Sequence, residues 1–190
     1  MKKRVNVSIT PPTVIFFALL ILLDRTALSI VPFLAAICHE LGHLAVMRIV
    51  KMDVRHIRIT VFGAEILSGG YKNELARAAV YAAGGAANIV SALTVLAIGL
   101  DGAYAELFVA CSLALAFVNL LPIRSLDGGC ILEALISHFA PTRAYAAVTV
   151  ASAVSLGLLW LVAVYILLVC GGNLSLLLFT ACLFWELFLR

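Results

Sequence analysis

The chain has 190 residues, of which 64% are hydrophobic and only 12% are charged, and its mean hydropathy is +1.15. An ordinary soluble domain is about half apolar and about one quarter charged. The composition therefore excludes a typical soluble domain and indicates a membrane protein. The net charge of +3 is spread over loops and forms no basic patch, so nucleic acid is not an expected partner.

Six apolar segments follow the basic residues 2–4, and each is a candidate transmembrane helix. They cover residues 11–24, 27–50, 75–100, 103–121, 144–170 and 174–189. The first and last are short for a bilayer, which takes about 20 helical residues. Residues 122–143 are expected to form a loop. With the N-terminus in the cytoplasm, every basic residue except Arg25 falls on the cytoplasmic side, so we predict that both termini are cytoplasmic.

Residues 55–62, between the second and third apolar segments, alternate polar and apolar side chains. This is the period of a half-buried strand, and Gly63 and the pair Gly69-Gly70 supply breaks. We expect one or two short strands at the membrane surface, joined by residues 5–9. The predicted fold class is an all-α polytopic membrane protein of about six transmembrane helices with a small membrane-surface β-hairpin or sheet. Residues 1–190 are expected to form one domain.

The sequence His-Glu-Leu-Gly-His at residues 39–43 lies within the second apolar segment. On a helix, positions i and i+4 share a face, so the imidazoles of His39 and His43 can reach one zinc ion. Glu40 is not needed as a ligand and lies where it can take a proton from a water on the metal. Ionisable side chains inside an apolar helix each cost about 2 kcal/mol or more to insert, and they are functional by default. The alternative is a pair of histidines that bond to neighbouring helices without metal.

A catalytic zinc site usually has a third protein ligand, and Asp127 stands out as the candidate. Asp127 follows a break at Pro122 and precedes Gly128 and Gly129, which let the backbone approach closely. On this local sequence alone, Asp127 is equally a cap or turn residue at the membrane surface. Other His, Asp and Glu residues lie at expected loops or helix ends and are interpreted as solvated: His56, His138, Asp53, Glu65, Glu74 and Glu133.

Two asparagines, Asn88 and Asn119, place amides inside the third apolar segment and at the end of the fourth. An amide in hydrocarbon needs partners, so both side chains are expected to face the protein interior. Two roles stay open. The amides either join helices, with Gly84 and Gly85 permitting close packing, or they orient a substrate backbone and stabilise an oxyanion.

Three motifs now stand in order along the chain: HELGH at 39–43, GGAAN at 84–88 and NLLPIRSLDGG at 119–129. Together they resemble the site-2 protease family of intramembrane zinc metalloproteases. Its hallmarks are a membrane-embedded H-E-x-x-H, a later G-x-x-x-N and an N-x-x-P-x-x-x-L-D-G motif. The resemblance spans residues 30–135. Without a PDZ-like insertion or a C-terminal CBS domain, the layout looks more like the compact group that contains stage IV sporulation protein FB.

The resemblance implies a zinc endopeptidase with one zinc ion per chain, held by His39, His43 and Asp127, and with Glu40 as the general base. Asn88 and Asn119 match polar family positions near the active site, and we expect them to bind substrate or stabilise the oxyanion. The compact layout and the basic N-terminus suit a prokaryotic plasma membrane, and the predicted topology places the active site nearer the cytoplasmic side. The implied partners are the lipid bilayer, a transmembrane protein substrate and a regulatory membrane protein.

A substrate helix hides its carbonyl groups in its own hydrogen bonds, so it must unwind before it can be cut. A strand edge can replace the lost bonds by β-addition, and the strand expected at residues 55–67 is our candidate platform. A plain surface hairpin that does not touch the substrate is the alternative.

Two rival functions stay open at this point. A transporter or metal-handling protein with a buried His/Asp ion site accounts for ionisable residues inside the membrane. It gives Glu40 no special reason to lie next to His39. An inactive protease homologue that acts as a scaffold would keep the same residues without turnover.

Overall fold

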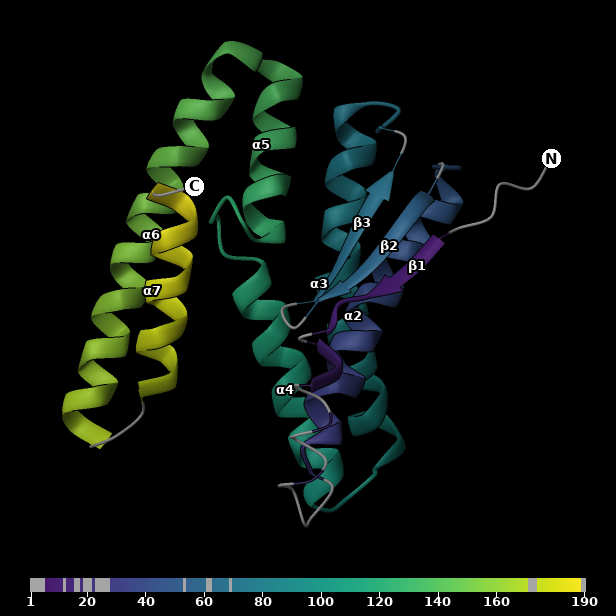
Figure 1. The fold of residues 1–190 in the computed structure, drawn as a ribbon, viewed down its shortest axis with the longest axis vertical. Helices are drawn as coiled ribbons and strands as arrows, with labels where there is room; N and C mark the ends of the chain where they lie inside the picture. Colours follow the sequence, from purple (N-terminus) through teal and green to yellow (C-terminus); the bar gives the residue numbers. More distant parts are fainter. Residues whose placement is uncertain are drawn as a thin grey trace. The chain divides into compact units, whose positions relative to one another are not determined.

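The computed structural model describes residues 6–11, 13–15, 18, 22, 28–52, 54–60, 63–68, 70–170 and 174–188. Its strands are β1 (Asn6–Ile9), β2 (Val54–Thr60) and β3 (Gly63–Ser68). Its helices are α2 (Ile30–Ile49), α3 (Glu74–Ile98), α4 (Ala103–Asn119), α5 (Asp127–Phe139), α6 (Pro141–Cys170) and α7 (Leu174–Phe188). The chain divides into two compact units, residues 1–118 and 119–190, and each is described by itself (Figure 1).

Helices α2, α3 and α6 are long and apolar enough to cross a membrane, and α4 and residues 176–185 of α7 form shorter apolar helices. These elements match the second to sixth predicted segments. Most of the first predicted segment, at 11–24, lies outside the described residues. The predicted fold class, a helical membrane protein with a small sheet, is confirmed.

The prediction of a loop at residues 122–143 is wrong for most of these residues, because Asp127–Phe139 form the helix α5. The helix begins directly after Leu126, which has extended backbone with φ −110° and ψ 163°. With 13 residues, α5 is too short to be found by a search for membrane-length apolar segments. Glu133 and His138 therefore lie in a helix, not in a loop.

The ends of the helices follow ordinary local signals. Asn73 caps α3, since its side chain accepts the backbone N–H of Ala76 at 2.7 Å. The same helix ends at Gly99, whose φ of 70° suits a residue without a side chain. Pro141 opens α6, where its missing N–H costs no helical hydrogen bond.

In the first unit, α2 and α3 pack directly against each other. Small residues permit this approach: a Cβ atom added to Gly42 would collide with the carbonyl oxygen of Ala83 and lie 2.7 Å from the Cβ of Ala87. The backbone of α3 therefore comes close to the face of α2 that carries the two histidines.

The same unit contains the expected sheet, whose strands lie in the order β1-β2-β3 (Figure 1). β1 runs parallel to β2, with Ile9 opposite Ile59, and β3 runs antiparallel to β2, with Ala64 opposite Ile59. β2 is therefore the central strand. Within the described residues β3 pairs with a strand on one side only. The His56 side chain of β2 forms a hydrogen bond of 2.8 Å with the Ser8 hydroxyl of β1 and so joins the two strands.

In the second unit, Ser152 of α6 holds the segment that leads into α5. Its hydroxyl oxygen accepts the backbone N–H of Arg124 at 2.9 Å, and it lies 2.7 Å from the carbonyl oxygen of Val148 and 3.3 Å from that of Pro122. Ser152 is fully buried. The Arg124 guanidinium lies over the ring of Tyr145, 4.1 Å from its centroid, and ties the same segment to α6 again.

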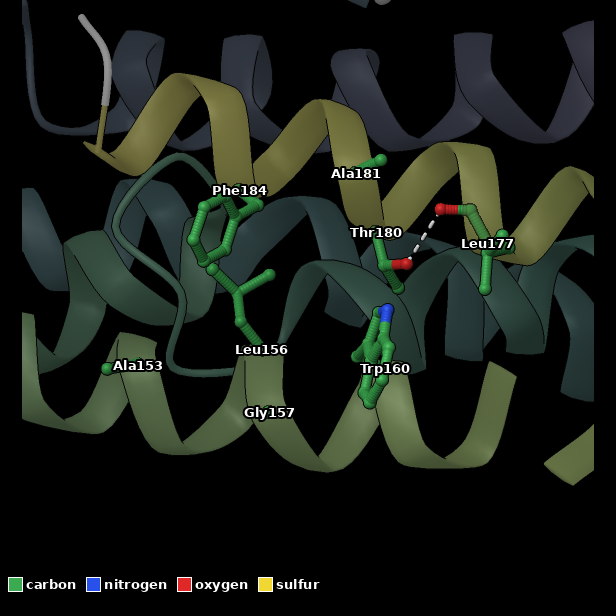
Figure 2. A pocket seen from close by; sticks show the side chains of 8 residues that line it. All are labelled: Ala153, Leu156, Gly157, Trp160, Leu177, Thr180, Ala181 and Phe184. Carbon is green, nitrogen blue, oxygen red and sulfur yellow. Dashed lines mark hydrogen bonds between the residues drawn. The ribbon is translucent and has the colours of Figure 1, made fainter. Parts of the chain in front are cut away.

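An apolar groove lies between α6 and α7, as Figure 2 shows. Trp160 of α6 and Phe184 of α7 are among its lining residues. Thr180 also lines it, and its hydroxyl donates to the carbonyl oxygen of Leu177 in its own helix at 2.8 Å (Figure 2). A Cβ atom added to Gly157, which also lines the groove, would meet nothing within 4 Å.

We predict that Ser152→Ala lowers the free energy of unfolding by about 1–3 kcal/mol, because it leaves the partly buried N–H of Arg124 without its acceptor. Thr149→Ala removes a hydroxyl that donates only to the carbonyl oxygen of Tyr145, four residues earlier in the same helix. That control should change stability by no more than about 0.5 kcal/mol. Thermal unfolding in detergent micelles measures both. Equal effects of the two substitutions would show that Ser152 does not hold the segment.

Candidate metal centre

His39 and His43 lie one turn apart on α2 and are almost fully buried, with 5% and 7% of their surfaces exposed. Their Nε2 atoms face each other at 3.2 Å, and their rings are nearly perpendicular, at 85°. Two imidazole nitrogens this close together can both reach one bound ion. The structure thus brings the two predicted histidine ligands together as the i and i+4 spacing requires.

The orientation of the His43 ring is set by α3. Its Nδ1 lies 2.8 Å from the carbonyl oxygen of Val80. A carbonyl oxygen can only accept, so Nδ1 carries the proton and donates it. In the neutral ring the lone pair is then on Nε2, the atom that faces His39. A metal-binding histidine usually donates its other ring N–H to an acceptor of this kind, which fixes the orientation of the ring.

His39 also contacts α3, through Asn88. The amide nitrogen Nδ2 of Asn88 lies 3.4 Å from Nδ1 of His39, and Asn88 is fully buried. The predicted interior position of this amide is therefore confirmed. Its contact is with a histidine of the H-E-x-x-H motif.

Gly84 makes room for both rings. A Cβ atom at this position would collide with Nε2 of His43 and lie 2.7 Å from Cε1 of His39. Val80, Gly84 and Asn88 are spaced by four residues and form one face of α3. Sequence analysis missed Val80, because it acts through a backbone carbonyl that any residue carries. Its spacing of four residues before Gly84 was the available signal.

The other predicted site residues are placed as follows. Glu40 lies next to His39 on α2 and is half-buried. Asn119 is the last residue of α4 and is half-buried. Asp127 is the first residue of α5, also half-buried, where a carboxylate interacts favourably with the helix dipole. Since Asn119 and Asp127 belong to the second unit, their roles beside the histidines stay predictions.

The backbone around Asp127 is tightly folded. A Cβ atom at Gly128 would collide with the carbonyl oxygen of Leu120, and one at Gly129 would collide with that of Ile123. Both positions accept only glycine, because the segment before α5 folds back onto the first turn of the helix. The two glycines of the third motif thus fix how Asp127 is presented.

We predict that Gly84→Ala lowers zinc affinity by at least about tenfold, because the added methyl group displaces both imidazole rings. Gly157→Ala places the same methyl group in open space and is the matched control. Zinc retained after dialysis against a chelator measures the effect. If Gly84→Ala retained zinc like the wild type, the rings would not need this position to be empty.

The chain is similar to known proteins in part of its sequence and in its fold. Residues 102–162, which include the third motif, match the model of peptidase family M50. None of the curated proteins matches the chain. Among solved structures, the site-2 protease from Methanocaldococcus jannaschii is similar, with a TM-score of 0.64 and 19% sequence identity. The similarity covers 98% of this chain and 90% of that one. The shared fold and the family M50 segment confirm that the chain resembles the site-2 protease family of membrane metalloproteases.

Proposed function

We propose that the protein is an intramembrane zinc endopeptidase that cuts a membrane-bound substrate within or near a transmembrane segment. One observation carries the proposal: His39 and His43 are buried in a membrane-length helix with their Nε2 atoms 3.2 Å apart. Both Nδ1 atoms have partners on α3. Such a pair is costly in hydrocarbon and suits a shared cation.

Asp127 is our proposed third ligand, and we expect one zinc ion per chain. Two imidazoles and one carboxylate form a donor set typical of catalytic zinc sites. The close packing of Gly128 and Gly129 against the backbone of the preceding segment supports this role, since a ligand must be held in one place. Zinc bound there would supply Lewis-acid chemistry, which activates water and polarises a carbonyl group.

Glu40 is proposed to act as the general base and then as the general acid. It accepts a proton from the attacking water and returns it to the leaving amine, so the peptide bond breaks with one water consumed. Asn119 is proposed to hydrogen-bond the substrate backbone or the oxyanion. The same role for Asn88 stays a prediction from the sequence.

We predict that Glu40→Gln lowers the cleavage rate by about 10²–10⁴-fold while zinc content stays at the wild-type level, because glutamine cannot accept the proton. Asp127→Ala is expected to lower zinc affinity. Cleavage of single-span substrates and metal analysis of the detergent-purified protein measure both effects. Glu106→Gln and Asp101→Ala, at exposed carboxylates, are the matched controls and should change neither quantity.

The outcomes separate the rival functions. If the wild type binds zinc and Glu40→Gln is as active as the wild type, the transporter or metal-handling alternative is favoured. Ion binding does not need a general base. Wild-type protein that folds but binds no zinc would contradict the proteolytic site itself.

The proposed setting is a prokaryotic plasma membrane with both termini in the cytoplasm and the active site nearer that side. Support comes from the basic residues, all of which except Arg25 fall on one side in the predicted topology. The proposed partners are the bilayer, a transmembrane protein substrate and a regulatory membrane protein.

The strand platform proposed for substrate binding is best assigned to β3. Because β2 is central, its backbone groups pair with β1 and β3, whereas β3 lies at the edge of the described sheet. β3 also contacts α2, the helix that carries His39 and His43. A substrate strand added to β3 would therefore lie next to the helix that holds the catalytic motif.

We predict that proline substitutions along β3 affect cleavage in an alternating pattern. In an antiparallel pair, successive residues direct their N–H groups alternately toward the partner strand and away from it. Proline at an outward position of Ala64, Glu65 or Ile66 should slow cleavage about fivefold and keep zinc, which reflects one lost hydrogen bond of about 1 kcal/mol. Proline at an inward position should disrupt the sheet.

Alanine at Glu65 and at Ile66 keeps the N–H group and is the control. Cleavage and zinc content are measured together for each variant. Normal cleavage by every proline variant that retains zinc would reject β3 as the platform.

A further inference from the structure

Asn88 is the feature of the centre that the proposed reaction leaves unexplained. It is fully buried, and its Oδ1 has no hydrogen-bond partner among the described residues. Its Nδ2 lies 3.4 Å from Nδ1 of His39, which is long for a hydrogen bond. A buried amide carbonyl without a partner is costly, so this placement needs an explanation.

The positions of the protons on the two histidines explain the placement of Asn88. Val80 fixes the proton of His43 on Nδ1 and leaves a lone pair on Nε2. If the amide nitrogen of Asn88 donates to Nδ1 of His39, a neutral His39 carries its proton on Nε2. That proton points at Nε2 of His43, 3.2 Å away. In this pattern only His43 offers a lone pair to a cation.

Both rings can bind one cation through Nε2 only if His39 also carries its proton on Nδ1. The group at that nitrogen must then be an acceptor. A half-turn of the Asn88 amide about its last side-chain bond exchanges Oδ1 and Nδ2 with little change in shape. Oδ1 then accepts the Nδ1–H of His39. One end of the amide lacks a described partner in either orientation, so the proton on His39 decides between them.

We propose that Asn88 is a positioning residue that makes His39 a zinc ligand: its Oδ1 accepts the Nδ1–H of His39, as the Val80 carbonyl does for His43. The inference rests on the proposed function, because it concerns the same zinc site. It differs from the oxyanion role expected from the sequence, in which the amide nitrogen donates to the substrate. Here the carbonyl end of the side chain acts, and it acts on the protein.

The two roles separate on substitution. Asn88→Asp retains an acceptor at the same position and removes the donor. Asn88→Leu has a similar branched shape and removes both, and Asn88→Ala is a second variant without an acceptor in case leucine does not pack. Ser91→Ala is the control on the same helix, because the Ser91 hydroxyl donates only to the backbone carbonyl of Asn88. Circular dichroism checks that each variant is folded.

The zinc dissociation constant of each detergent-purified variant is measured by competition with a chelating indicator, and the cobalt(II) absorption spectrum reports the ligand geometry. We expect Asn88→Leu to weaken zinc binding by about 10–100-fold, as loss of a group that supports a metal ligand does. Asn88→Asp should bind zinc at least as tightly as the wild type, with a wild-type-like cobalt spectrum. Ser91→Ala should not differ from the wild type.

Zinc binding by Asn88→Asp that is as weak as that of Asn88→Leu would overturn the acceptor role, and so would wild-type affinity in Asn88→Leu. Either result in a wild type that binds zinc leaves the proposed function intact. Absence of zinc from the folded wild type would instead overturn the proposed function.

Discussion

The structure of the first unit depends on one physical requirement: two imidazoles buried in an apolar helix must have partners for their ring nitrogens. The partners come from a single face of α3, where the Val80 carbonyl meets His43 and the Asn88 amide meets His39. These contacts need α3 to lie very close to α2. Gly42 on one helix and Gly84 on the other allow that distance, because a side chain at either position would collide with the facing helix.

A similar requirement shapes the segment before α5 in the second unit. This segment is not helical, so its backbone groups need partners in other elements. Ser152 of α6 meets the N–H of Arg124, and its hydroxyl lies near two carbonyl oxygens. Gly128 and Gly129 then let the segment fold against the first turn of α5. These contacts hold the backbone on both sides of Asp127, which suits its proposed role as a metal ligand.

Backbone hydrogen bonds also decide which strand of the described sheet can bind a substrate. β2 is satisfied on both sides by β1 and β3. The edge strand β3 has one row of backbone groups that can pair with an added strand. This edge belongs to a strand that contacts α2, so the proposed substrate platform and the histidine motif lie in one compact unit.

The sequence by itself determined the membrane class, the apolar helices, the presence of strands near residues 55–67 and the pairing of His39 with His43. These features follow from composition and from local periodicity, which act over a few residues along the chain. It did not reveal α5, because 13 residues of mixed polarity fall below membrane-span length. It also left Asn88 between two roles. Only the tertiary structure showed the contact with His39, and the contributions of the Val80 carbonyl and the Ser152 hydroxyl, because these hydrogen bonds join residues that are 28 to 49 positions apart in the sequence.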